Sequence, residues 1–142
     1  MEKSILVVED DPQDEALLLR AFRKTNLRAD LLFAYDGEEA LEYVLGTAKK
    51  PEGIYGPPSL VMLDLKMPKM GGLETLRILR QDSRSKYIPV VVFTSSTMEQ
   101  DMKDSFELGA NSFVSKPIDF DQLVRVLTQI GSYWLSLNHS PA

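Results

Sequence analysis

The sequence contains no cysteine and a single histidine, and both facts narrow the chemistry that the protein can perform. Without cysteine there is no disulfide, no thiolate nucleophile and no cysteine-ligated zinc, iron–sulfur or haem site. His139 lies in a short polar tail, residues 138–142, where we expect it to be solvated. A catalytic dyad built on histidine is therefore not expected.

Long apolar runs and clustered positive charge are also missing. No run approaches the roughly 20 apolar residues that cross a membrane, and the acidic N-terminal segment is unlike a signal peptide. We therefore expect a cytoplasmic protein with no membrane partner. Sixteen Lys and Arg oppose 21 Asp and Glu, for a net charge of −5, and the basic residues form no stripe along the sequence. Direct binding to nucleic acid is not expected.

What is present is the composition of one globular domain: 142 residues, 44% hydrophobic and 26% charged. Five short apolar runs alternate with segments of helical periodicity. The runs are residues 5–8, 30–34, 60–63, 88–93 and 112–115. The first, third and fourth are apolar throughout, as strands buried on both faces of a parallel sheet must be. The pattern predicts an α/β fold of (βα)5 type, with helices on both sides of the sheet.

Residues with helix-capping side chains precede four of the helical segments. They are Asp11 with Pro12 behind it, Asp36, Thr97 and Asp119. In the fourth helical segment Met98, Met102 and Phe106 recur every four residues, which predicts a stripe buried in the core. Gly109 then supplies the expected helix stop.

Two segments depart from a minimal (βα)5 chain. Residues 46–58 form a long connection with three Gly and three Pro in 13 residues, which is either a partner-binding loop or a tolerated surface insertion.

The second is the last helix, expected from about 119 to 137. It carries a core stripe (Phe120, Leu123, Val124, Leu127, Ile130) and a second apolar set (Val126, Tyr133, Trp134, Leu137). One face cannot bury both sets, which favours a partner or homodimer contact, with docking onto the 46–58 loop as the alternative.

Three carboxylates follow predicted strands directly. Glu9 and Asp10 come after the first run, and Asp64 comes after the third. The carboxyl ends of parallel strands share one edge of the sheet, so these side chains converge if the two strands are neighbours. Converging carboxylates repel unless a proton or a cation lies between them. Oxygen ligands at an open site favour Mg²⁺.

The fourth and fifth runs end on groups that suit an anion. Thr94 offers a hydroxyl and Lys116 an amine, which together can bind phosphoryl oxygens. Taken singly, each of these residues is more often a helix start, a loop carboxylate, a strand-end residue or a solvated charge. Their joint placement at four strand ends favours the functional interpretation.

The motifs at these positions resemble the receiver domain of two-component response regulators. They are Val8-Glu9-Asp10-Asp11-Pro12, Leu63-Asp64-Leu65-Lys66-Met67-Pro68, Gly71-Gly72, Phe93-Thr94-Ser95 and Ser115-Lys116-Pro117, and the resemblance covers nearly the whole chain. It implies a flavodoxin-like doubly wound sheet of strand order 2-1-3-4-5. It also implies a single receiver domain over residues 1–142 that catalyses only its own phosphorylation and dephosphorylation.

The resemblance implies a role for each site residue. Asp64 is the phosphoacceptor; Asp10, Asp64 and the Lys66 carbonyl ligate Mg²⁺, with Glu9 acting mostly through water; Thr94 and Lys116 contact the phosphoryl oxygens. Lys116-Pro117 resembles the family's cis peptide bond. Ser95 and the Lys66 side chain lie at the rim. Thr94 and Phe113 form the switch pair, although Phe113 is equally well explained as a core residue.

The resemblance also implies a partner, a sensor histidine kinase that donates the phosphoryl group. The long loop and the ending Ile130-Gly-Ser-Tyr-Trp-Leu135 resemble small stand-alone regulators paired with bacterial phytochrome kinases, which implies a homodimer through the last helix.

Two alternatives stay open: a receiver-shaped binding module that accepts no phosphate, and a receiver cut from a larger regulator. A hydrolase is disfavoured because the chain has no G-x-S-x-G motif or Gly-rich phosphate loop. A haloacid-dehalogenase-type phosphatase would need a second acid where Lys66 stands.

Overall fold

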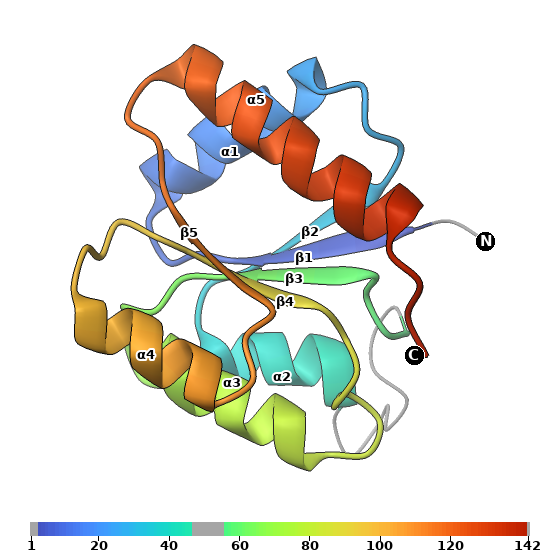
Figure 1. Ribbon diagram of the computed structural model, residues 1–142, viewed down its shortest axis with the longest axis vertical. Helices are drawn as coiled ribbons and strands as arrows, with labels where there is room; N and C mark the ends of the chain where they lie inside the picture. The colour runs from blue at the N-terminus through green and yellow to red at the C-terminus, as the bar shows by residue number, and fades with distance from the viewer. Residues whose placement is uncertain (1–2, 47–55, 142) are drawn as a thin grey trace.

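The computed structural model describes residues 3–46 and 56–141. Its five strands are parallel and lie in the order β2-β1-β3-β4-β5 (Figure 1). Their bounds are β1 Ser4–Val8, β2 Asp30–Ala34, β3 Leu60–Leu63, β4 Val90–Thr94 and β5 Ser112–Ser115. The predicted strand order is confirmed. The fourth strand begins two residues later than expected, after Pro89, which has no N–H to donate to a neighbouring strand.

Helices cover both faces of the sheet, as the apolar central strands require. Helices α1 and α5 lie on one face, and α2, α3 and α4 on the other (Figure 1). The bounds are α1 Pro12–Lys24, α2 Gly37–Leu45, α3 Gly72–Gln81, α4 Glu99–Glu107 and α5 Phe120–Ser132, followed by a π-helical turn, Tyr133–Leu137. Most of the predicted 46–58 loop, residues 47–55, lies outside the described residues.

The two faces of the sheet build two separate apolar layers, and β1 shows how. Ile5 and Val7 pack in the layer that contains residues of α1 and α5. Leu6 and Val8 point the other way and pack with residues of α2 and α3. Because successive side chains of a strand point to opposite faces, one apolar run of four residues serves both layers.

Three of the four predicted helix caps are formed. The carboxylates of Asp11, Asp36 and Asp119 accept hydrogen bonds from backbone N–H groups in the first turns of α1, α2 and α5, at 2.8, 2.8 and 2.9 Å. The prediction for Thr97 is wrong, since α4 begins after Met98 and has no side-chain cap at that position. The hydroxyl of Ser96 instead accepts from the Met98 N–H at 3.2 Å.

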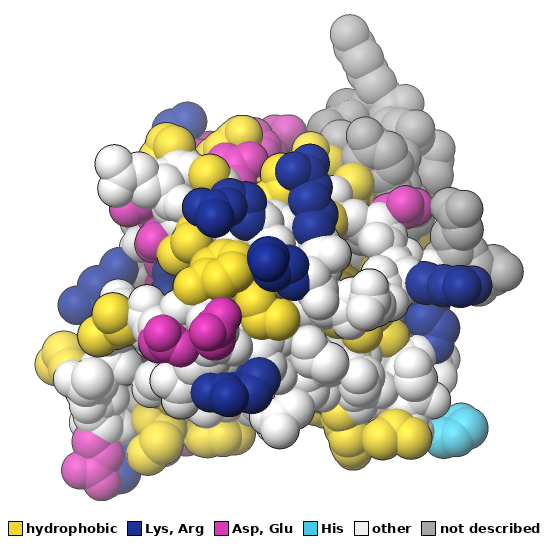
Figure 2. Space-filling view, turned by 90° about the horizontal axis from the view of Figure 1, so that it is seen from above, with side chains coloured by type: hydrophobic (Ala, Val, Ile, Leu, Met, Phe, Trp, Pro, Cys, Tyr) yellow, Lys and Arg dark blue, Asp and Glu magenta, His cyan; other side chains and the backbone are white. Residues whose placement is uncertain are grey.

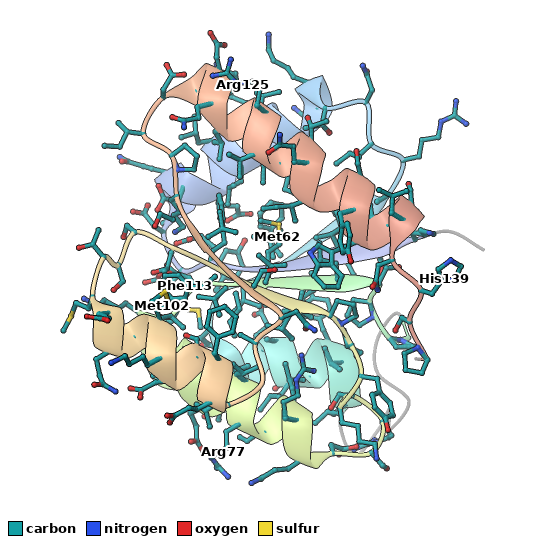
Figure 3. The ribbon with its side chains drawn as sticks, viewed as in Figure 1. Met62, Arg77, Met102, Phe113, Arg125 and His139 are labelled. Carbon is teal, nitrogen blue, oxygen red and sulfur yellow. The ribbon has the colours of Figure 1, made fainter. Side chains whose placement is uncertain are left out.

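The predicted core stripe of α4 is also wrong. Met98, Met102 and Phe106 are 57%, 39% and 49% exposed, and Figure 3 labels Met102 on this helix. The buried residue of α4 is Ser105, whose hydroxyl donates to the Asp101 carbonyl at 2.7 Å. The helix therefore packs on the face that carries Ser105, and the apolar stripe, which lies one residue further along the chain, is exposed.

The end of the last helix is more deeply packed than the sequence indicated. Val126 and Trp134, two members of the second apolar set, pack against the same apolar layer as Leu135, which is 4% exposed. Leu135 continues the buried line of Leu123 and Leu127 at helical spacing. Tyr133 and Leu137 remain 49% and 68% exposed.

The outer surface of the α1/α5 layer carries more basic side chains than the sequence pattern suggested (Figure 2). Arg20, Arg23, Lys24 and Arg125 are all exposed on these two helices. The Arg20 guanidinium lies 5.3 Å from the centre of the Phe120 ring.

No helix among the described residues is both long and apolar enough to span a bilayer. The absence of a nucleic-acid partner and the cytoplasmic location stay predictions.

Gly72 marks the point where α3 approaches the strand end that carries Asp64. A Cβ atom at Gly72 would lie 2.2 Å from the carbonyl oxygen of Asp64, whereas one at Gly71 would lie 3.2 Å from the Leu65 carbonyl. We expect Gly72→Ala to lower the free energy of unfolding by about 1–3 kcal/mol, since backbone cannot yield as a side chain can. Urea denaturation of both variants tests this. An equal loss for Gly71→Ala and Gly72→Ala would contradict the close approach.

Candidate functional site

The edge of the sheet is built by backbone hydrogen bonds that continue one residue past the strands. The Glu9 N–H donates to the Ala34 carbonyl at 2.9 Å, and the Asp64 N–H donates to the Val8 carbonyl at 3.1 Å. The Lys116 N–H donates to the Thr94 carbonyl at 2.8 Å. These bonds fix where the side chains of Glu9, Asp64 and Lys116 leave the main chain.

Glu9, Asp10 and Asp64 meet at this edge. One carboxylate oxygen from each lies within 4.8 Å of the other two. Glu9 and Asp64 are 2% and 8% exposed. Backbone N–H groups hold one oxygen of each buried carboxylate, because Glu9 Oε1 accepts from the Asp11 N–H at 3.2 Å and Asp64 Oδ1 from the Leu65 N–H at 2.8 Å. The structure thus brings together the three carboxylates that the sequence placed at strand ends.

Lys116 neutralises part of this charge. Its ammonium hydrogen-bonds to Glu9 Oε2, lies 3.2 Å from Asp64 Oδ2, and lies 3.6 Å from Asp14 Oδ2. Sequence reasoning missed Asp14. Asp14 lies in the first turn of α1, and its local sequence carries no sign of Lys116, which is remote in the chain.

Burial and charge shift the pKa values of the central pair. Burial raises the pKa of Glu9 above its ordinary value, and the hydrogen bond and charge of Lys116 reverse this only in part. Burial by itself would lower the pKa of Lys116, but the hydrogen bond to Glu9 and the charges of Asp64 and Glu9 raise it above its usual value. Lys116 is therefore held as a cation, at the point where an added anion would need one.

The remaining predicted residues surround the carboxylates at different depths. Thr94 is buried, and its hydroxyl oxygen accepts from the Ser96 N–H at 3.2 Å. Ser95 is exposed and lines a cavity of about 260 Å³ together with Lys116. Lys66 is exposed at the rim. Phe113 is half-buried against the apolar layer of α2 and α3 (Figure 3), as a plain core residue would be.

The structure contradicts the predicted cis peptide bond and agrees with the expected exposure of His139. No peptide bond among the described residues is cis, so the predicted cis bond before Pro117 is wrong. The Lys116 side chain reaches Glu9 and Asp64 from a trans bond. His139 is exposed at the opposite end of the sheet from the carboxylates (Figure 3).

The donor set suits a hard divalent cation. The cluster offers carboxylate oxygens only, close enough together to share one ion, and Asp10 is only half-buried, so the cluster remains open to solvent. Three carboxylates against one ammonium leave a net charge of −2 for those four groups, which one Mg²⁺ would balance.

Comparison with known proteins agrees with this geometry. The family model for the response regulator receiver domain matches residues 5–128. The chain belongs to the response regulator receiver family. Members of this family are signalling proteins rather than enzymes in the usual sense, and act in two-component systems.

The relatives include regulators associated with phytochromes. The response regulator Rcp1 of Synechocystis sp. is 34% identical, with 99% of this chain and 94% of that protein covered. The phosphorylated cyanobacterial phytochrome response regulator RcpA has a TM-score of 0.87 and 31% identity, with both chains fully covered. The Mn²⁺-bound form of Rcp1 has a TM-score of 0.85 and 32% identity over 99% of each chain. The Rcp1 structure thus shows a divalent metal bound to one of these neighbours.

The raised pKa of Glu9 predicts how stability depends on pH. The stability that comes from this group is present at acidic pH and is lost as the pH rises through the folded-state pKa. In metal-free buffer, Glu9→Gln removes that titration, so the free energy of unfolding of the variant should vary less between about pH 4 and 8 than that of the wild type. Urea denaturation across this range checks it. The exposed Glu38→Gln is the control, and the same flattening there would contradict the assignment.

Proposed function

We propose that Asp64 accepts a phosphoryl group in a reaction that requires Mg²⁺. Asp10, Asp64 and the Lys66 carbonyl would ligate the metal, and Glu9 would hold it mostly through water. The observation that carries the proposal is the setting of the Asp64 carboxylate. One oxygen is held by the Leu65 N–H and the other by Lys116, next to two further carboxylates. A carboxylate held in this way is pre-oriented as a nucleophile.

The transfer forms one bond and breaks one. An Asp64 oxygen attacks the phosphorus of a phosphohistidine on a partner kinase, the P–N bond breaks, and the imidazole nitrogen takes up a proton. Bound Mg²⁺ supplies charge stabilisation for the phosphoryl oxygens. The Lys116 ammonium, already within reach of Asp64, donates to one of those oxygens. Hydrolysis of the acyl phosphate by water returns Asp64, so the protein catalyses only its own modification.

The rim residues govern access and lifetime. Ser95 is small and exposed beside the cavity that Lys116 lines, which leaves room for the phosphoryl group. The exposed Lys66 side chain is positioned to engage a phosphoryl oxygen or the attacking water. Comparing the decay of the phosphorylated wild type with that of Lys66→Ala measures its contribution.

Readout of the modification begins at Thr94. Its hydroxyl oxygen now accepts from the Ser96 N–H, and a phosphoryl group on Asp64 offers the Thr94 O–H a new acceptor. Movement of Thr94 changes the space available to Phe113 on β5, which lacks a hydroxyl and responds by packing alone. The result is a shift between two packed states.

The donor is a sensor histidine kinase, and the names of the relatives favour one of phytochrome type. Rcp1 and RcpA match this chain over nearly their whole length, and RcpA is described as a phytochrome response regulator. Homodimerisation through the C-terminal helix is supported by Tyr133 and Leu137, which expose apolar surface beyond the packed Trp134.

Phosphorylation is tested with acetyl phosphate and Mg²⁺. The intact wild-type protein should gain the mass of one phosphoryl group, and Asp64→Asn should gain none. Asp104→Asn, the same change on the surface of α4, should be modified like the wild type. An unchanged wild-type mass would favour a receiver-shaped binding module that accepts no phosphate.

The dimer is tested by sedimentation equilibrium. Tyr133→Ala should weaken self-association, because an exposed aromatic at an interface contributes more than most contacts. Tyr87→Ala, which removes another exposed tyrosine, 56% exposed on a different part of the surface, is the matched control. Equal association of both variants and the wild type would contradict a dimer through this helix.

A further inference from the structure

Lys116 has one partner more than the phosphotransfer site needs. Two of its three carboxylates, Glu9 and Asp64, belong to the cluster that suits a divalent cation. The third, Asp14, lies in the first turn of α1 with its side chain 44% exposed, and it is outside that cluster. The cation site of the proposed function does not account for this third carboxylate next to the Lys116 ammonium.

Glu9 cannot serve two cations equally well. In the structure its Oε2 is hydrogen-bonded to Lys116, while Oε1 accepts from the Asp11 N–H. A divalent cation at the cluster, directly or through a water that it binds, would compete with Lys116 for the same carboxylate. Glu9 is 2% exposed, and the Lys116 side chain is only 14% exposed. If the Lys116 ammonium left Glu9 for a position with no charged partner, its buried positive charge would be destabilising.

The space next to Lys116 leads to Asp14. A cavity of about 260 Å³ lies on this side, and both residues line it. The rest of its lining is mostly apolar, with Leu17, Leu18 and Phe93 among the residues. Asp14 is the one carboxylate in that lining, at 3.6 Å from Nζ. A small movement of the lysine side chain toward the cavity would shorten this ion pair to hydrogen-bond distance.

We propose that Asp14 is a positioning residue that holds the Lys116 ammonium when a divalent cation takes Glu9. The inference rests on the cation site of the proposed function. Asp14 lowers the free energy needed to move the Lys116 ammonium away from Glu9. It also keeps Lys116 at the mouth of the site, where an incoming phosphoryl group can reach it. Asp14 therefore strengthens cation binding without touching the cation.

The test measures the Kd for Mg²⁺ by titration calorimetry on the unphosphorylated protein, so it does not depend on phosphotransfer. Asp14→Asn should raise the Kd roughly two- to fivefold, the range of a partly exposed ion pair. Glu15→Gln removes the same charge one residue along the helix, where the carboxylate accepts from the Tyr35 hydroxyl at 3.4 Å. This control should change the Kd clearly less.

A second background shows whether the effect passes through Lys116. In Lys116→Met no ammonium competes for Glu9, so adding Asp14→Asn should change the Kd no more than adding Glu15→Gln. An effect of Asp14→Asn that persists undiminished in Lys116→Met would overturn the proposal, as would equal effects of Asp14→Asn and Glu15→Gln in the wild type. If the wild type binds no Mg²⁺ at all, the cation site of the proposed function fails and the inference falls with it.

Discussion

Mutual repulsion of Glu9, Asp10 and Asp64 is the constraint on which the site depends. A parallel sheet places the ends of β1 and β3 side by side, and backbone bonds past these ends fix where the Glu9 and Asp64 side chains leave the main chain. Asp10 lies close to both. Two of the three carboxylates are almost fully buried. Such a cluster is stable only with positive charge beside it, and Lys116 at the end of β5 supplies that charge in the structure.

This constraint ties the chemistry to the fold. Lys116 is separated from Glu9 by more than one hundred residues in the sequence, and the parallel sheet brings the ends of β1 and β5 to the same edge. In the proposed function, an internal ammonium and a bound metal ion share the compensation of this cluster. Lys116 would then link cation binding to phosphoryl transfer.

The strands and the strand-end residues could be predicted because they obey strong local rules. A fully apolar run such as residues 60–63 must be buried on both sides, and a polar residue directly after it must lie at the sheet edge. The face on which α4 packs could not be predicted in the same way. Periodicity identifies an apolar stripe, but the small Ser105 allows the closer approach to the core, and Met98 and Met102 remain outside. Asp14 was missed because its partner Lys116 is remote in the sequence.

The central claim is most directly tested by the free energy of unfolding of Lys116→Met, measured with EDTA and again with saturating Mg²⁺. Without metal the variant should lose about 3 kcal/mol relative to the wild type, since a buried carboxylate is left without its partner. With Mg²⁺ most of this loss should be recovered, because the cation replaces the ammonium. A loss of the same size under both conditions would contradict the account.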